Sequence, residues 1–218
     1  NGFRMTRMMD KFNKYNLFQK WTKSLARMQK VSKDVEVHVM FNNPTSAALT
    51  CGTGFDGLAI AHDTHYGLGS SLGQTYDNYL NAALSYTSLE SARYYFKTLK
   101  DDRGQLLGGN PSKLVIEPTL WPTAQEILKS GDKPHELSNT KNAFENYLTI
   151  YEDPMLTSTT AWFVIDKSDG YDCNVITTEE PDMIIKDAPD NTRDRVAISE
   201  QMFTYGWGDA RKVYWGRG

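Results

Sequence analysis

The residues with the clearest capacity for chemistry are the two histidines of the stretch His62-Asp63-Thr64-His65. Histidines three positions apart can bind a metal ion, but a competent site needs three or four ligands, and no further metal-binding signature accompanies this pair. We therefore expect these residues to make loop contacts. His38 and His135 stand alone in the sequence and are expected to be structural.

The patterns for nucleophilic and phosphate chemistry are also incomplete. Neither Cys51 nor Cys173 sits in a reactive context, and the glycine-rich run 67–73 lacks the lysine and the helix of a phosphate loop. Asp101 and Asp102 fit a turn, and no pair of carboxylates stands out as acid and base. The sequence therefore predicts no catalytic, cofactor-binding or metal-binding residues, no cofactor, and a protein that is not an enzyme.

The composition predicts a folded chain without a strongly charged average surface. The 218 residues are 39% hydrophobic and carry a formal net charge of -3, so general attraction to nucleic acid or anionic membrane is weak. Lys and Arg are abundant between Arg4 and Lys33, whereas the charged residues of 179–194 are mostly acidic, an asymmetry that could steer one copy against another. The two distant cysteines argue against a zinc site and a disulfide framework. No stretch approaches 18 apolar residues, so no membrane partner is expected.

The elements that position any site are organised around one long segment. From Asn16 to Phe41 the apolar residues recur at steps of three and four, which predicts a long amphipathic helix. Asn16 is a plausible N-cap, and Asn42-Asn43-Pro44 ends the helix. We expect Trp21, Leu25 and Met28 to be buried on one face, so that Leu25→Asp prevents folding or assembly.

The other elements are shorter. The sequence predicts a short helix around 5–12, a helix at 88–100 with Thr87 and Glu90 as a capping box, and a helix at 119–130. It predicts strands at 113–117, 147–152, 161–166 and 173–177 and one long strand over 196–205. The segments 45–74 and 181–195 are expected to be irregular and a loop, respectively. We expect the strands 113–117, 161–166 and 173–177 to share one sheet, flanked by the two helices.

The order of several motifs resembles that of the Mu-like phage major head subunit. The motifs are the end of the long helix at Val39-Met40-Phe41-Asn42, Phe55-Asp56-Gly57-Leu58-Ala59 with His65, the run from Leu89 to Gly104, Lys113-Leu114-Val115-Ile116-Glu117-Pro118-Thr119-Leu120 with 123–128, the segment Leu156 to Phe163, and the closing Tyr205-Gly206-Trp207-Gly208-Asp209-Ala210-Arg211. The resemblance covers most of the chain.

The resemblance implies an α+β fold of the HK97 capsid type. On this template, residues 1–50 form a peripheral domain with the long spine helix, 51–177 form an axial domain of helices around a central sheet, and 178–218 return to the peripheral domain. Family members carry an N-terminal arm and an extended hairpin before the spine. Because the sequence opens at Asn1-Gly2-Phe3, we expect an upstream portion of the native chain to be missing from it.

The function implied is that of a major capsid protein of a tailed bacteriophage. Its copies would assemble as hexamers and pentamers into the icosahedral shell that encloses the DNA genome, with weak non-specific DNA contact and with portal, scaffold and decoration proteins as further partners. The implied location is the virion capsid, assembled in the host cytoplasm. The alternatives are a bacterial compartment protein with the same fold and a metal-dependent hydrolase that uses His62 and His65.

Overall fold

The computed structural model describes residues 2–12, 16–47, 54, 56–66, 75–101, 103–134, 140–166, 174–178, 182–187 and 194–218. The chain forms two compact units. The first unit comprises Asn1–Val37 and Ile176–Tyr205, and the second comprises His38–Val175 and Gly206–Gly218. Each unit is therefore built from two segments that are far apart in the sequence. Among the described residues, no helix combines the length and the apolar composition needed to cross a membrane.

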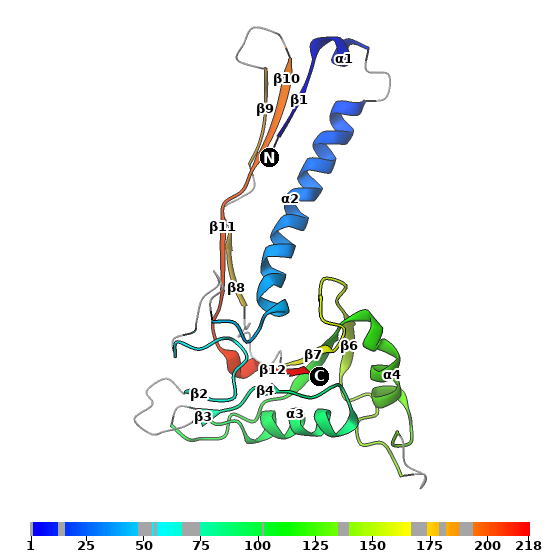
Figure 1. Cartoon of the computed structure of the whole chain (residues 1–218), viewed down its shortest axis with the longest axis vertical. Helices are drawn as coiled ribbons and strands as arrows, with labels where there is room; N and C mark the ends of the chain where they lie inside the picture. The colour runs from blue at the N-terminus through cyan, green and yellow to red at the C-terminus, as the bar shows by residue number, and fades with distance from the viewer. Residues whose placement is uncertain are drawn as a thin grey trace. The chain divides into compact units, whose positions relative to one another are not determined.

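The long helix is confirmed as α2, Leu17–Asn42, with 26 residues (Figure 1). Asn16 precedes it with φ 51°, and its carbonyl oxygen accepts the Lys20 N–H at 3.1 Å. Asparagine tolerates this left-handed conformation better than most residues, which allows an abrupt entry into the helix. Pro44 lies two positions beyond the last helical residue, as the sequence predicted.

The first unit also contains a three-stranded antiparallel sheet in the order β1-β10-β9. Its strands are β1 Gly2–Met5, β9 Asp182–Asp187 and β10 Arg195–Glu200, and the short helix α1 Arg7–Lys11 follows β1. The Arg4 guanidinium lies 2.7 Å from the buried Asp194 carboxylate, which also accepts the Arg7 N–H at 2.9 Å. This pair joins the start of β10 to the turn between β1 and α1.

A different face of α2 packs in the first unit from the one that we expected. The residues of the packed face recur at steps of four, three and four: Phe18, Thr22, Leu25 and Gln29. Phe18 joins Met5 and Ala197 in a buried cluster. The Gln29 amide donates to the Glu200 carbonyl oxygen at 2.9 Å and accepts the Ser199 hydroxyl at 2.6 Å.

The expected burial of Trp21 and Met28 is therefore wrong for this chain by itself. Trp21 is 39% exposed and Met28 is 64% exposed, and Leu25 is only half-buried. Because successive helical residues are about 100° apart, the stripe of Trp21 and Met28 lies beside the packed face rather than on it. The amphipathic pattern predicted the helix correctly, but it did not predict which face this chain covers.

The predicted strand 196–205 and the predicted loop 181–195 both need correction. β10 ends at Glu200, and β11, Phe203–Trp207, belongs to a separate two-stranded sheet with β8, Asn174–Thr178. Part of the expected loop 181–195 is the strand β9, which pairs antiparallel with the whole of β10, from Asp187 opposite Arg195 to Asp182 opposite Glu200. The local composition predicts a loop, and the segment forms a strand because it pairs with β10.

The second unit contains a five-stranded mixed sheet in the order β4-β12-β7-β5-β6 (Figure 1). Its strands are β4 Tyr79–Leu80, β5 Pro111–Ile116, β6 Thr149–Glu152, β7 Ala161–Asp166 and β12 Val213–Arg217. A two-stranded ribbon pairs β2, His65–Tyr66, with β3, Thr75–Tyr76. Residues 206–218 lie in this unit, although the sequence placed 178–218 in a return to the first domain.

Two of the three strands expected to share a sheet do so. β5 pairs with β7 antiparallel, but β8 pairs with β11, and Cys173 itself lies outside the described residues. The prediction that 173–177 shares this sheet is therefore wrong. The reason is that β7 has no open edge, since β5 takes one side and the C-terminal β12 takes the other.

Both faces of the five-stranded sheet are covered. Alternate residues of the central strands point to opposite faces. On one face, Leu114, Ile116, Trp162, Val164 and Tyr214 pack against the two flanking helices. On the other face, Val115, Phe163, Val213 and Trp215 pack with Met40, Ile60, Ala61 and Leu156. These apolar layers explain why the run 161–165 reads as a buried strand.

The two helices on the sheet are α3, Tyr86–Thr98, and α4, Trp121–Lys129. The expected capping box at Thr87 and Glu90 is wrong, because Ser85 and Ser88 form it: each side-chain oxygen accepts the backbone N–H of the other residue, at 3.1 and 2.8 Å. The apolar residues that recur along both helices are buried. These are Leu89, Ala92, Tyr95, Phe96, Leu99, Ala124, Ile127 and Leu128.

The last turn of α2 is fixed by polar contacts within the second unit. His38 Nε2 lies 2.9 Å from the Asp153 carboxylate. The Asn42 side chain donates to the Met155 carbonyl oxygen at 3.0 Å and accepts the Thr157 N–H at 2.8 Å. These contacts connect the end of the helix to the segment between β6 and β7.

We predict that Gly216→Ala destabilises the protein. A Cβ at Gly216 would lie 2.0 Å from the Trp162 indole, which is fully buried, so the ring or β12 must move. Overpacking of this kind costs about 1–3 kcal/mol of unfolding free energy. Urea denaturation measures the change. Gly131→Ala is the matched control, because a Cβ there meets no atom within 4 Å. Equal stability of the two variants would contradict the proposed packing.

Candidate functional site

The histidine cluster of the sequence is divided between a buried and a partly exposed residue. His65 begins β2 and is fully buried, whereas the His62 side chain is 37% exposed. Their rings are 6.0 Å apart between centroids. The ring of Tyr76, on the paired strand β3, stacks on His65 at 5.0 Å.

Both ring nitrogens of His65 face oxygen atoms of the same unit. Nδ1 lies 2.6 Å from the Asp56 carboxylate, whose side chain is 1% exposed, and Nε2 lies 3.2 Å from the Ile60 carbonyl oxygen. The other carboxylate oxygen of Asp56 accepts the Leu58 N–H at 3.1 Å, which forms a local turn. The buried ion-pair geometry therefore fixes the path of residues 56–65.

Asn78 extends this buried network. Its amide group donates to the carbonyl oxygens of Ile60 at 2.8 Å and Ala210 at 3.2 Å, and its side-chain oxygen accepts the His62 N–H at 2.9 Å. Its backbone carbonyl oxygen accepts the Trp215 N–H at 2.8 Å. A fully buried amide with these partners connects three segments that are distant in sequence, so it specifies one arrangement of them.

The geometry does not favour metal binding at this cluster. His62 Nδ1 accepts the Thr64 N–H at 3.0 Å, and both nitrogens of His65 face oxygen atoms, so neither directs a lone pair to a shared point. In the part of the chain that the structure describes, no group of three or more His, Cys, Asp or Glu residues is placed to hold a metal ion. That the protein binds no metal or cofactor stays a prediction.

Two of the motifs that carried the family resemblance meet in this network. Trp207, from the closing motif, places its ring edge-on against His65 at 6.0 Å. Gly54 is needed at this point, because a Cβ there would lie 2.2 Å from the Trp207 ring. Asp209 accepts the Arg211 N–H and its Nε–H, at 3.0 and 2.9 Å. The buried histidine, aspartate and asparagine therefore hold the closing motif against the segment 54–65.

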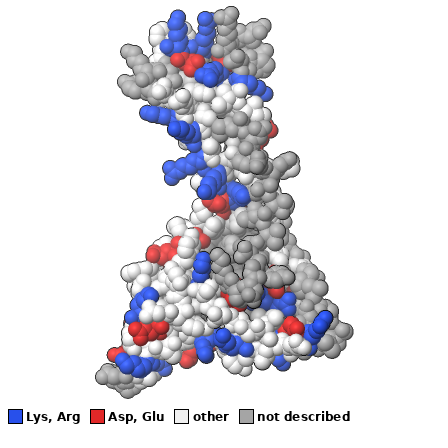
Figure 2. All heavy atoms as spheres, turned by 180° about the vertical axis from the view of Figure 1, so that it is seen from behind, with Lys and Arg blue, Asp and Glu red and all other residues white. Residues whose placement is uncertain are grey.

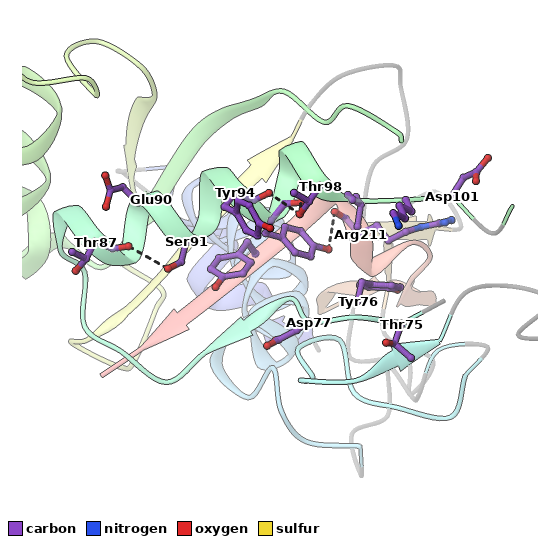
Figure 3. Close-up of a pocket in the computed structure, with 14 residues that line it drawn as sticks. Thr75, Tyr76, Asp77, Thr87, Glu90, Ser91, Tyr94, Thr98, Asp101 and Arg211 are labelled. Carbon is purple, nitrogen blue, oxygen red and sulfur yellow. Dashed lines mark hydrogen bonds between the residues drawn. The ribbon is translucent and has the colours of Figure 1, made fainter. Parts of the chain in front are cut away.

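A groove of about 780 Å³ lies beside the network in the second unit. Figure 3 shows Thr87, Ser91, Tyr94 and Thr98 along α3, with Tyr76, Asp77 and Arg211 across from them; these and neighbouring residues line the groove. The Tyr95 hydroxyl donates to the Arg211 carbonyl oxygen at 3.2 Å. The lining is rich in hydrogen-bonding side chains, and Tyr94 is exposed.

Tyr95 and Tyr214, two of the residues that line this groove, are unsuited to acid–base chemistry near neutral pH. Burial raises the pKa of Tyr95 well above its usual value. Burial, followed by the nearby Asp77 carboxylate, raises the pKa of Tyr214 to about 12. Both phenols therefore stay protonated at pH 7 and can act only as hydrogen-bonding groups.

A second groove, of about 640 Å³, lies in the first unit. It runs between the exposed stripe of α2 and the strand residues Phe3, in β1, and Phe203, in β11. Trp21, Leu25 and Met28 form its helical wall. Large apolar residues that are exposed together are typical of surfaces that bind another protein. This groove is better suited to protein contact than to chemistry.

Sequence reasoning missed part of the network. Asn78 was not singled out, and Asp56 appeared only within a resemblance motif, because no local spacing marks their contacts. Asp56 contacts His65 9 positions away, and Asn78 contacts Ala210 132 positions away. His38 was expected to be structural, and its contact with Asp153 fits that expectation. Asp101 accepts the N–H groups of Arg103 and Gln105, as expected of a turn residue.

Several other candidates lie outside the described residues. They are Cys51, Cys173, Asp102, His135 and the glycine-rich run 67–73. That run contains a G-x-S-x-G spacing at 69–73 that the sequence reasoning passed over. The functional motif needs a strand before the serine and a helix after it, whereas β3 follows this run, so the spacing alone carries no catalytic assignment.

Comparisons with known proteins identify the class to which the chain belongs. The sequence model of the phage capsid protein family matches residues 1–216. No curated protein matches the chain. The chain is similar in structure to the capsid of the cyanophage P-SCSP1u, with 10% identity and a TM-score of 0.64 over 100% of this chain and 70% of that one.

Two further solved structures share the fold. One is the SrpI encapsulin complex from Synechococcus elongatus PCC 7942, with 4% identity and a TM-score of 0.55 over 100% of this chain and 71% of that one. The other is from Mycobacterium phage Che8, with 10% identity and a TM-score of 0.52 over 99% and 68%. At such identities the likeness shows the fold alone, which is the HK97-type fold expected from the sequence.

The function follows from the family and not from any catalytic geometry. The second unit contains a buried structural network and a polar groove, and the first unit contains an open apolar groove. The family match covers almost the whole chain. The role supported is that of a major capsid protein in the phage head. The chain belongs to the phage capsid protein family.

Proposed function

We propose that copies of this chain assemble as hexamers and pentamers into an icosahedral shell, the head of a tailed phage, that encloses the DNA genome. The observation that carries the proposal is the open apolar stripe of α2. Met28, Val31 and Val35 are 64%, 42% and 51% exposed, although they belong to the stripe that organises the helix. An apolar stripe of this length is costly in water and is expected to be covered by another copy.

Further exposed apolar residues in the first unit support the same conclusion. Met8 in α1, Phe12 just after α1 and Met202 between β10 and β11 are each more than 60% exposed. A shell repeats each contact over many identical copies, so modest contacts suffice for a stable particle. Surfaces such as these, rather than a catalytic centre, carry the function of a shell protein.

The two compact units fit the two domains of the shell fold. We assign the first unit, with most of α2 and the β1-β10-β9 sheet, to the peripheral domain. We assign the second unit, with helices on a central sheet, to the axial domain. With these boundaries the axial domain takes His38–Val175 and Gly206–Gly218, in place of the expected 51–177.

The finer parts of the proposal rest on the sequence resemblance. They are a Mu-like head subunit, portal, scaffold and decoration proteins as partners, and assembly in the host cytoplasm. The alternative is a bacterial compartment shell, which shares the fold with the SrpI encapsulin. The phage capsid family match favours the head protein. Negative-stain microscopy of purified particles tests shell formation, and nuclease-protected DNA inside particles from infected cells separates a virus head from a compartment.

We predict that Met28→Glu blocks assembly without unfolding the chain. Met28 is 64% exposed, so the carboxylate stays hydrated in the free chain but would be desolvated where another copy covers the groove. Light scattering follows assembly and circular dichroism follows folding. Gln19→Glu is the control, because it adds the same charge to an exposed position of the same helix. Normal particles from Met28→Glu would overturn the assignment of this groove.

A further prediction concerns enzyme activity, which we propose is absent. Calorimetric titration with Zn²⁺ should give no stoichiometric binding, because both nitrogens of His65 already face oxygen atoms.

His65→Ala should lower the unfolding free energy by about 3–5 kcal/mol, since it leaves the buried Asp56 carboxylate without its histidine partner. His62→Ala is the matched control, with an expected loss of about 1 kcal/mol. Zinc binding that disappears in His62→Ala would instead favour the hydrolase.

A further inference from the structure

The outer face of α2 carries a row of positive charges. Lys20, Lys23, Arg27 and Lys30 are all exposed and follow one another at steps of three, four and three, which places them on one side of the helix. We call these four residues the basic stripe. Figure 2 shows Lys and Arg gathered along this part of the molecule.

The basic stripe is not neutralised by the protein. In the part of the chain that the structure describes, none of its four residues forms an ion pair, and no acidic residue occurs from Leu17 to Lys33. A solvated helix face usually mixes both signs, because opposite charges three or four positions apart stabilise the helix. Here each successive pair repels, so the arrangement works against helix stability.

The position of the stripe within the helix adds to the positive potential. Lys20 and Lys23 lie in the first two turns of α2, and the first turn contains no acidic residue. The N-terminal end of a helix carries a partial positive charge that favours anions and disfavours cations. The helix dipole and the side chains therefore act in the same direction, and a bound anion would be stabilised by both.

The spacing suits a row of phosphates. The ten positions between Lys20 and Lys30 span about 15 Å at 1.5 Å per residue. One DNA strand places phosphates about 3.4 Å apart along the duplex axis, so this length faces about four of them. The stripe has four cations and offers no geometry for reading bases, which fits contact with the backbone alone.

We propose that the basic stripe of α2 binds the phosphate backbone of double-stranded DNA without sequence preference. This inference rests on the proposed function, in which the shell encloses a DNA genome, and it names the surface that contacts the genome. With the formal net charge of the chain at -3, binding is confined to the stripe and stays weak and salt-sensitive. Such contact lets packaged DNA move along the wall.

The experiment measures binding of the full chain to a fluorescein-labelled 24-bp duplex of random sequence at several salt concentrations. Four phosphate contacts predict a slope of log K against log salt of about −3.6, which is a loss of about a hundredfold between 50 and 200 mM salt. The variant Lys20→Gln, Lys23→Gln, Arg27→Gln, Lys30→Gln should lose at least tenfold in affinity at 50 mM salt, and its slope should approach zero.

The control variant changes charge by the same amount at exposed positions in the second unit: Lys97→Gln, Lys100→Gln, Arg103→Gln and Arg217→Gln. It should keep the slope and stay within threefold in affinity. Equal losses in both variants would show an effect of total charge and overturn the proposal. Unchanged DNA binding of the stripe variant together with failed assembly would make the stripe a protein contact, which also overturns it.

Stability gives an independent readout. Because glutamine is a good helix former and removes the repulsion between the cations, the stripe variant should keep or raise its melting temperature.

Should the fourfold variant fail to fold, the four single substitutions, such as Lys23→Gln, replace it. Each is expected to reduce the slope of log K against log salt by about 0.9, and an unchanged slope in all four overturns the proposal. Microscopy separates the two hypotheses: particles without DNA binding refute only the stripe, and DNA binding without particles refutes only the shell.

Discussion

The second unit depends on the antiparallel pairing of β12 with β7. This pairing places β12 between β4 and the central strand β7 of the five-stranded sheet, where Gly216 leaves room for the Trp162 indole. The strand also presents Tyr214 to the layer under α3 and Trp215 to the opposite layer. The Trp215 N–H donates to the backbone carbonyl oxygen of the buried Asn78, which connects the sheet to the network of His65 and Asp56.

The long helix α2 has three faces, one that packs within the chain and two to which we assign partners. One face packs on the sheet of the first unit through Phe18 and Gln29. A second face carries the exposed apolar stripe that we assign to contact with another copy, and a third carries the basic stripe that we assign to DNA. In a shell, each copy must bind neighbouring copies through contacts that are repeated many times, and it must bind the enclosed DNA only weakly. Apolar and charged surfaces on one rigid element meet both needs.

The candidate site shows how far residue types alone can lead. The sequence showed that the His62 and His65 pair is incomplete as a metal site, because metal sites need several ligands at known spacings. The actual partners of His65 could not be predicted from the sequence. Asp56, Ile60 and Trp207 reach it through the folding of loops and the return of the C-terminal segment, and nothing in local spacing encodes contacts across 142 positions, the separation of Trp207 from His65.

The sequence by itself determined the elements whose signals are local. The 3.6-residue periodicity and a proline stop defined α2, and the apolar run from Ala161 to Ile165 defined β7. The tertiary structure decided which strands pair and which faces are covered. β9 exists because it pairs with all of β10, β8 lies outside the central sheet because β12 occupies the edge of β7, and Trp21 and Met28 stay exposed because another face of α2 packs. Pairing and burial depend on partners that are distant in sequence, so only the folded chain specifies them.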